Sequence, residues 1–243
     1  MTDPPAVALV TGGGSGIGAA CVRALAAIGH HVVVADLDET SAKAVAGEVD
    51  GVVAATNCAD PDSVDEAVRR AVAHGRLVAA VNSAGVSGPA SPLGDYSNED
   101  WRRVLAVNLD GVFFSTRAQV RAMRDTGGGS IVNIASVFGA VGAPLAPAYT
   151  AAKHGVVGLT RSAALAHAAD GIRVNAIGPG FVRTPMLEQR ADAGRLEQLT
   201  ALHPLGRLGT PDDVASLAVW LCGAGSQFVT GGFFPVDGGY LSQ

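Results

Sequence analysis

The chain contains 243 residues, of which 48% are hydrophobic, 16% charged and 5% aromatic, and its net charge is −5. This hydrophobic content excludes a disordered chain, and the length predicts a single domain, residues 1–243, built around one large core. Because the basic residues form no cluster, the sequence disfavours nucleic acid as a partner. The 32 glycines follow no period, which indicates tight turns and close backbone approaches.

The cysteines and the apolar segments bear on where the protein resides. Cys21, Cys58 and Cys222 are widely spaced and form no CxxC motif, which disfavours a disulfide framework and a zinc site. We therefore expect no bound metal and a reducing compartment, the cytoplasm. The first ten residues lack a basic n-region, and Pro144, Pro147 and several glycines interrupt the uncharged stretch 126–152. We expect neither a secretory nor a membrane segment.

Seven apolar runs of strand length alternate with helical stretches along the chain. They are rich in Val and Ile and almost continuous, which is typical of strands covered on both faces. The predicted strands are Ala6–Thr11, His31–Asp36, Gly51–Thr56, Leu77–Asn82, Ser130–Ala135, Ile172–Ile177 and Phe233–Val236. This order predicts an α/β fold with a doubly wound, seven-stranded parallel sheet, helices on both faces, and ligands at the carboxyl ends of the strands.

Capping residues indicate several helix starts. Asp60-Pro61 and Thr210-Pro211 each place an N-cap before a proline at the first helical position, and Ser97 precedes a long amphipathic helix predicted over 98–126. Residues 186–204 scatter apolar side chains among charged ones after the sixth strand. This segment forms either a lid over the substrate or an ordinary pair of surface helices.

A glycine-rich turn, Thr11-Gly-Gly-Gly-Ser-Gly-Ile-Gly18, follows the first strand and precedes a helix predicted from Ala19 to about Ala27. Glycines let the backbone approach a pyrophosphate, which then lies at the positive N-terminus of the helix. The predicted cofactor contacts in this turn are Gly12, Ser15, Gly16, Ile17 and Gly18. Because this turn follows a buried strand and precedes a helix, it is a specific indicator of dinucleotide binding.

An acidic residue ends the second strand. Asp36 follows Gly18 by 18 residues, close to the spacing expected of a carboxylate that binds the adenosine ribose hydroxyls. A 2′-phosphate there would meet a like charge, and positions 12–18 and 37–42 contain no Lys or Arg to offset it. The sequence therefore predicts NAD rather than NADP, with Asp36 and Leu37 as contacts.

Tyr149 and Lys153 are four residues apart in a helical stretch and therefore share one face. An unperturbed tyrosine has a pKa near ~10, and a nearby ammonium together with a positive nicotinamide ring would stabilise its phenolate. Lowering that pKa by about three units requires roughly 4 kcal/mol. Tyr149 would then exchange a proton with an alcohol or a carbonyl. Ser136, just past the fifth strand, belongs to the same edge of the sheet.

Together these motifs resemble the short-chain dehydrogenase/reductase family, from roughly Ala6 to Gly239. The resemblance is carried by the Thr11-Gly-x-x-x-Gly16-x-Gly18 turn, Asn108, Ser136 and Tyr149-x-x-x-Lys153. Further matching segments are Asn82-Ser-Ala-Gly85, Arg173-Val-Asn-Ala-Ile-Gly-Pro-Gly180 and Val236-Asp-Gly-Gly239. The resemblance implies a single-domain Rossmann fold and a homotetramer, with the long helix and the tyrosine helix at one interface and the C-terminal strand at another.

The resemblance also implies a role for each catalytic residue. Tyr149 is the general acid/base, and Lys153 holds the nicotinamide ribose hydroxyls and lowers the pKa of the tyrosine. Ser136 binds the substrate oxygen and stabilises charge on it. Asn108 anchors a water that links Lys153 to solvent. Further cofactor contacts that it implies are Asn57, Cys58, Asn82, Ala84, Gly85, Pro179, Gly180, Val182 and Thr184.

Two positions depart from the family pattern. Ser83 stands where a second asparagine often occurs, and Asn57 stands where an aspartate commonly receives the adenine amino group. Since an amide oxygen also accepts hydrogen bonds, we expect at Asn57 a modest change in cofactor affinity.

The residues predicted beside the chemistry are mostly apolar and favour a neutral or hydrophobic secondary alcohol or its ketone. They are Val137, Phe138, Val141, Phe181, Met186 and Leu187, with Ser87 and Pro89 on the opposite loop. One alternative is an NADP(H)-dependent 3-oxoacyl thioester reductase. Another is a catalytically silent NAD-binding regulator, which the complete set of four catalytic residues disfavours.

Overall fold

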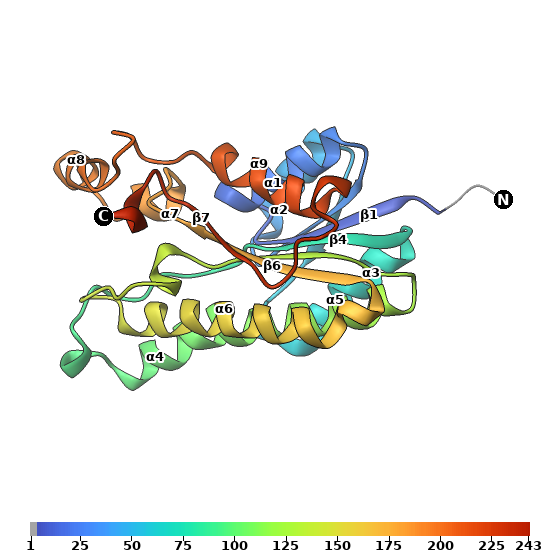
Figure 1. Cartoon of the computed structure of the whole chain (residues 1–243), viewed down its shortest axis with the longest axis horizontal. Helices are drawn as coiled ribbons and strands as arrows, with labels where there is room; N and C mark the ends of the chain where they lie inside the picture. The colour runs from blue at the N-terminus through green and yellow to red at the C-terminus, as the bar shows by residue number, and fades with distance from the viewer. Residues whose placement is uncertain (1–3) are drawn as a thin grey trace.

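The computed structural model describes residues 4–243 and contains one parallel sheet in the order β3-β2-β1-β4-β5-β6-β7 (Figure 1). The strands are β1 (Ala6–Thr11), β2 (His31–Asp36), β3 (Val52–Ala55), β4 (Arg76–Asn82), β5 (Gly129–Ile134), β6 (Ile172–Pro179) and β7 (Phe233–Val236). This confirms the predicted doubly wound sheet. The order reverses between β1 and β4, which creates a crevice at their carboxyl ends.

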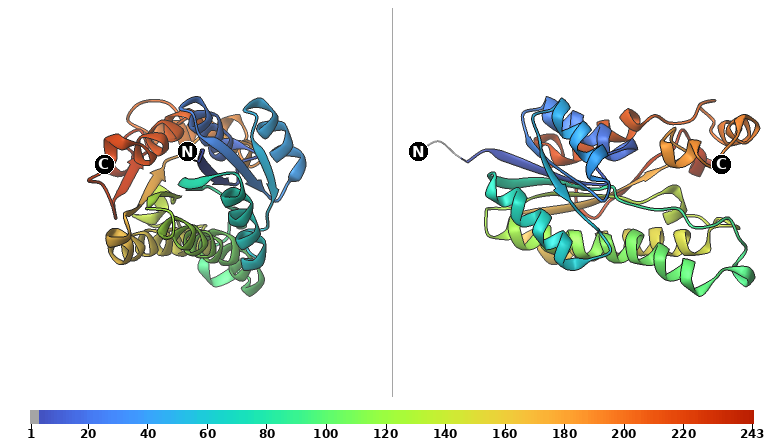
Figure 2. Two further views of the ribbon diagram at one scale, coloured as in Figure 1. Left: turned by 90° about the vertical axis from the view of Figure 1, so that its right-hand side faces the viewer. Right: turned by 180° about the vertical axis from the view of Figure 1, so that it is seen from behind.

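Helices cover both faces of the sheet, as Figures 1 and 2 show. One face carries α1 (Gly16–Ala27), α2 (Glu39–Glu48) and α9 (Pro211–Cys222). The other face carries α3 (Pro61–Ala73), α5 (Gly111–Arg124) and α6 (Pro147–His167). Each layer buries small and branched side chains against the Val-rich strands. Leu25 on α1 and Met123 on α5 are fully buried, and each such side chain contributes about 1.5–3 kcal/mol.

The predicted long helix over 98–126 is interrupted, which corrects the sequence-based expectation. It consists of α4 (Asn98–Leu105), a π-helical turn η2 (Ala106–Asp110), and α5. The Asn108 side-chain amide donates a hydrogen bond to the Val104 carbonyl at 3.0 Å, and the Gly111 N–H bonds the Ala106 carbonyl five residues back. The turn therefore inserts an extra residue, a feature that often marks functional sites in helices. The first helix also starts earlier than predicted, at Gly16 rather than Ala19.

The segment between β6 and β7 extends beyond the carboxyl edge of the sheet. Its short helices α7 (Pro185–Glu188) and α8 (Ala193–Ala201) lie beside the C-terminus (Figure 1). The single-turn helices elsewhere are η1 (Leu93–Asp95), η3 (Val137–Gly139), η4 (Ala168–Asp170), η5 (Ala224–Ser226) and η6 (Tyr240–Ser242). Within residues 4–243, every helix is too short or too polar to cross a membrane.

Candidate active site

The predicted site residues come from elements that meet at the carboxyl edge of the sheet. Thr11 ends β1 beside Asn82, the last residue of β4, and the Ser83 N–H bonds the Thr11 carbonyl at 3.1 Å. Ser136 follows β5, while Tyr149 and Lys153 lie on α6. The topology thus brings the glycine-rich turn and the catalytic candidates to one crevice.

The glycine-rich turn needs glycine at two positions because other backbone lies directly against it. Gly12 has φ +66°, and a Cβ there would lie 2.7 Å from the Ala84 Cα. At Gly18 a Cβ would overlap the Gly12 carbonyl oxygen. The close approach of turn, helix and Ala84 leaves a backbone-lined cradle, which fits the phosphates of a dinucleotide.

The N-terminus of α1 differs electrostatically from those of α2, α3 and α4. Those three helices begin with capping side chains, Asp38, Asp60 and Ser97, and each has an acidic residue in its first turn. Within residues 4–243, Ser15 makes no side-chain capping bond, and the first turn of α1 carries no acidic residue. The N–H groups of α1 and its positive dipole are therefore available to an anion such as a pyrophosphate.

Asp36 ends β2 with its carboxylate directed at the glycine-rich turn. Its Oδ2 accepts a hydrogen bond from the Gly14 N–H at 2.9 Å, and its Oδ1 accepts one from the Asp38 N–H at 3.0 Å. The side chain is partly exposed, so lone pairs remain for ribose hydroxyls. The nearest basic residue along the chain, Lys43, forms an ion pair with Glu39 at 2.9 Å. Leu37 is 74% exposed.

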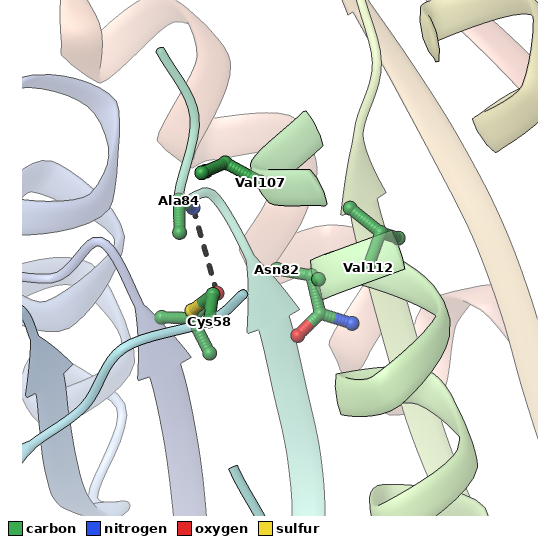
Figure 3. A pocket seen from close by; sticks show the side chains of 7 residues that line it. Cys58, Asn82, Ala84, Val107 and Val112 are labelled. Carbon is green, nitrogen blue, oxygen red and sulfur yellow. Dashed lines mark hydrogen bonds between the residues drawn. The ribbon is translucent and has the colours of Figure 1, made fainter. Parts of the chain in front are cut away.

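Cys58 lies beneath the turn, in a small hollow that it shares with Ala84, Val107 and Val112 (Figure 3). Burial raises the pKa of its thiol to about 11, which makes the thiol unreactive at neutral pH. Asn57 is exposed, and its Oδ1 accepts a hydrogen bond from the Ala59 N–H at 3.1 Å. The oxygen keeps a second lone pair, which is the acceptor that the predicted contact with adenine requires.

The side chain of Asn82, a predicted cofactor contact, is bound within the protein. Its amide donates hydrogen bonds to Gln119 Oε1 at 3.0 Å and to Asn133 Oδ1 at 2.9 Å, and Gln119 Nε2 donates back at 2.7 Å. Asn133 in turn donates to Thr160 Oγ1 at 3.0 Å. Figure 3 shows the Asn82 side chain between β4 and α5. This buried polar network, Asn82, Gln119, Asn133 and Thr160, leaves the main chain of Asn82 to meet a cofactor.

Sequence reasoning missed the other three members of the network, although one signal was present. Asn133 interrupts the apolar run of β5 and pairs in register with Asn82 on β4. Gln119 and Thr160 lie on helices and were recognisable only once α5 and α6 were placed over these strands. A polar residue in the middle of a buried strand therefore indicates a partner on each layer.

Asn108 is fully buried and ties η2 to the chain that follows β4. Its Oδ1 accepts a hydrogen bond from the Val86 N–H at 3.1 Å, and its Nδ2 donates to the Val86 carbonyl at 2.8 Å. A Cβ at neighbouring Gly85 would lie 2.8 Å from this Oδ1 and 4.0 Å from the Lys153 Nζ. Asn108 and Lys153 thus lie on the same side of Gly85, and the water proposed to link them to solvent stays a prediction.

Ser136, Tyr149 and Lys153 come together at the start of α6. The Lys153 Nζ donates a hydrogen bond to the Ile134 carbonyl at 2.8 Å and lies 5.4 Å from the centre of the Tyr149 ring. The Ser136 Oγ accepts one from the Phe138 N–H at 3.2 Å, and Ser136 also hydrogen-bonds the Tyr149 hydroxyl. The spacing of YxxxK on one helix face therefore does place the phenol and the ammonium together.

Burial controls the protonation of this pair. Desolvation raises the pKa of Tyr149 to about 12, while its hydrogen bond to Ser136 acts in the opposite direction on that pKa. Desolvation lowers the pKa of Lys153 to about 8. The chain's own groups thus move the Tyr149 pKa upward, the reverse of the shift that a base requires, because loss of water outweighs the hydrogen bond to Ser136.

The segment after β6 returns to the glycine-rich turn. A Cβ at Gly16 would lie 3.3 Å from the Thr184 Cγ2, so these two predicted cofactor contacts face each other. Pro179 ends β6, Gly180 lies against His203 and Asp237, and Val182 is buried and bridges to Gly209. The N-terminus of α1 and the segment after β6 therefore lie against each other at the predicted cofactor site.

An aromatic cluster borders the predicted substrate side. The rings of Phe138 and Phe181 meet edge to face at 5.9 Å between centroids, and Tyr240 lies 5.9 Å from Phe181 and 6.5 Å from Phe138. His203 lies 5.8 Å from Phe181. Tyr240 and His203 were missed because both join the cluster only through the tertiary fold. Val137, predicted to line the pocket, is buried in the core instead.

A pocket of about 470 Å³ lies on another side of this cluster. Phe181 and His203 form one wall, and the remaining walls come from residues 204–213 and 235–239. Since Ser136 and Tyr149 are not among its lining residues, it is separate from the catalytic candidates.

Known proteins resemble this chain over nearly its whole length. A family model described as enoyl-(acyl carrier protein) reductase matches residues 12–241. Cyclohexanol dehydrogenase of Acinetobacter sp. (strain SE19) is 43% identical over 243 residues, which cover 98% of this chain and 95% of that protein. The chain belongs to the short-chain dehydrogenase/reductase family.

Other members of the family are similarly close. The 3-alpha-(or 20-beta)-hydroxysteroid dehydrogenase of Mycobacterium tuberculosis (strain ATCC 25618 / H37Rv) is 41% identical over 97% of this chain and 89% of its own length. The solved structure of ElxO with NADP bound has a TM-score of 0.91 at 30% identity and covers 99% of this chain and 100% of that one. As a short-chain dehydrogenase/reductase, the chain is an oxidoreductase that transfers a hydride between a nicotinamide dinucleotide and a secondary alcohol or ketone.

Proposed function

We propose that this short-chain dehydrogenase/reductase uses NAD to interconvert a neutral, hydrophobic and ring-shaped secondary alcohol and its ketone. The observation that carries the proposal is the convergence of Ser136, Tyr149 and Lys153 beside an aromatic wall at the edge of the dinucleotide cradle. When bound, the nicotinamide ring accepts a hydride from the alcohol carbon or returns one to the carbonyl carbon.

The chain's own residues handle the proton and the substrate oxygen. The Tyr149 phenolate takes the proton of the alcohol during oxidation, and the Tyr149 hydroxyl donates a proton to the carbonyl oxygen during reduction. Ser136 donates a hydrogen bond to that oxygen and stabilises the negative charge that develops there. The Lys153 ammonium uses one donor for Ile134, which leaves two for ribose hydroxyls. Its charge lies 5.4 Å from the centre of the Tyr149 ring and, together with the charge of a bound nicotinamide ring, would stabilise the Tyr149 phenolate.

Asp36 supports NAD as the cofactor. Its carboxylate ends β2 within reach of the glycine-rich turn, and its charge would repel the 2′-phosphate of NADP. ElxO carries NADP, so fold alone does not decide the cofactor. Measuring Kd for NADH and NADPH by fluorescence titration tests this choice, and we expect NADH to bind at least about tenfold more tightly. In Asp36→Asn the ratio of Kd for NADPH to Kd for NADH should decrease. Tighter binding of NADPH than of NADH by the wild type would contradict the assignment.

The aromatic wall supports a ring-shaped, uncharged substrate. Phe138, Phe181 and Tyr240 present edges and faces against which an alicyclic ring packs. The names of two relatives, cyclohexanol dehydrogenase and hydroxysteroid dehydrogenase, point to the same class. The test is NADH formation with a panel of cyclic and linear secondary alcohols. We expect higher kcat/KM for cyclic members, and a preference for charged or linear alcohols would contradict the class.

The second candidate is an NADP(H)-dependent 3-oxoacyl thioester reductase. It is favoured by the acyl-carrier description of the matching family model and by the NADP bound to ElxO. NADPH consumption with a 3-oxoacyl thioester, exceeding the turnover of any alcohol with NAD, would establish it.

We further propose a cytoplasmic, single-domain homotetramer. Four exposed large apolar side chains support the assembly: Phe113 on α5, Leu165 on α6, Trp220 on α9 and Phe228 before β7. The three free cysteines suit a reducing compartment. Sedimentation velocity measures the assembly, and a monomer at micromolar concentration would contradict it.

A further inference from the structure

One side chain crosses from the segment after β6 to the chain after β4. Arg190, just past α7, donates a hydrogen bond from Nη1 to the Gly88 carbonyl at 2.6 Å and a longer one from Nη2 to the Ser87 carbonyl at 3.5 Å. About one hundred residues separate the two partners, which lie on different walls of the crevice. A planar guanidinium can bind two adjacent carbonyl groups at once.

The loop that accepts the hydrogen bonds of Arg190, residues 86–88, is fixed by contacts with buried parts of the protein. Val86 exchanges two hydrogen bonds with the side chain of Asn108. The hydroxyl of Tyr96 lies so close to Gly88 that any Cβ at position 88 would overlap it. Arg190 therefore binds to a fixed point, and the position of its own segment depends on that bond.

The segment that carries Arg190 is attached weakly elsewhere. All four residues of α7 are exposed or partly exposed, and in α8 the buried residue is Leu199. The base of the segment is fixed by His203, whose Nδ1 donates to the Leu199 carbonyl at 2.8 Å and whose Nε2 accepts from the Phe181 N–H at 3.2 Å. Few buried contacts mean that α7 and α8 can open at a low free-energy cost.

We propose that Arg190 is a positioning residue that latches residues 185–201 across the mouth of the active site. His203 holds the base of this segment, Thr184 faces Gly16 across the dinucleotide cradle, and Arg190 fastens the outer end to Ser87 and Gly88. Breaking the latch lets the segment swing away and releases the cofactor and product faster. The link to release rests on the proposed function, whereas the latch itself is a property of the chain alone.

The latch is tested first without any ligand, by hydrogen–deuterium exchange of the full chain. Arg190→Ala should speed exchange in peptides from 185–201 by about three- to tenfold, and Arg190→Lys, which keeps one donor group, by less. Arg195→Ala is the matched control, since Arg195 is exposed on α8 and bonds Gln198 within its own helix. The proposal would be overturned if these peptides exchanged at the wild-type rate in Arg190→Ala, or if Arg195→Ala accelerated their exchange as much as Arg190→Ala does.

Stopped-flow release of NADH and steady-state kinetics provide the second measurement. In Arg190→Ala, NADH dissociation and KM should rise by about three- to tenfold without a fall in kcat, while Arg195→Ala behaves as wild type. A fall in kcat with unchanged KM and unchanged release would overturn the latch. If wild-type protein bound no NADH, the proposed function would fail, and the exchange experiment would still decide whether Arg190 is a latch.

Discussion

Two buried polar clusters lie near the same strand ends and differ in how fully their atoms are paired. In the buried polar network, the Asn82 amide uses both of its N–H donors, to Gln119 and Asn133, and its oxygen accepts a hydrogen bond from Gln119. Near them, the ammonium of Lys153 donates one bond among the described residues, although it has three donors. We call the first cluster saturated, because its polar atoms find partners within the chain and so contribute stability. We call the cluster of Tyr149 and Lys153 unsaturated, because its polar atoms remain available to a ligand, and its pKa values are shifted.

The sharpest test of this contrast removes one hydroxyl from the unsaturated cluster. Tyr149→Phe should lower kcat/KM by about a thousandfold, because proton transfer to or from the substrate oxygen loses its positioned group. The free energy of unfolding should change little, because the Tyr149 hydroxyl bonds Ser136 and does not link one strand to another. Turnover and thermal unfolding are measured on the same preparation. Activity equal to that of wild type would refute Tyr149 as the acid/base.

The matching test removes one member of the saturated network. Gln119→Leu keeps the apolar packing but removes both hydrogen bonds between Gln119 and the Asn82 amide, so the free energy of unfolding should fall by about 1–3 kcal/mol. NADH affinity should stay within about twofold because Gln119 lies below the crevice. Gln198→Leu, on the exposed side of α8, is the control and should cost less than about 0.5 kcal/mol. If Gln119→Leu were as stable as wild type but bound NADH more weakly, the network would serve cofactor binding and not stability, and the contrast between the two clusters would be wrong.

The sequence predicts well those features whose signal is local. The strand runs, the glycine-rich turn and the YxxxK pair each depend on neighbours within a few residues, and the fold keeps the turn after β1 and Tyr149 one helical turn from Lys153. The order of strands then follows from alternation with helices, since parallel neighbours need a crossover.

What the sequence does not predict depends on contacts between distant segments. The π-turn at Asn108 arises because its amide finds Val86, a partner 22 residues away, as well as Val104. The hydrogen bond from Arg190 to Gly88 joins residues 102 positions apart. The residues that flank Arg190 in the sequence do not distinguish it from the other arginines of the segment. The upward shift of the Tyr149 pKa is missed for the same reason, because burial is set by the assembled fold.

The last comparison concerns the contribution of Lys153, in the unsaturated cluster, to the pH dependence of stability. The pKa of Lys153 is lowered from 10.5 to about 8 by burial. Between these two pKa values the unfolded chain keeps the proton and the folded chain releases it, so the unfolded state binds more protons. The contribution of Lys153 to stability therefore rises with pH in this window, by at most about 1.4 kcal/mol per unit.

Variants isolate this contribution from that of other titrating groups. The free energy of unfolding of wild type minus that of Lys153→Met should increase between about pH 8 and pH 10, and should level off below about pH 8, where Lys153 is protonated in both states. Gln119→Leu removes no titratable group, so its difference from wild type should stay flat over the same range. A flat difference for Lys153→Met as well would show that Lys153 keeps its proton despite burial, and the contrast between the two clusters would then rest on Tyr149 alone.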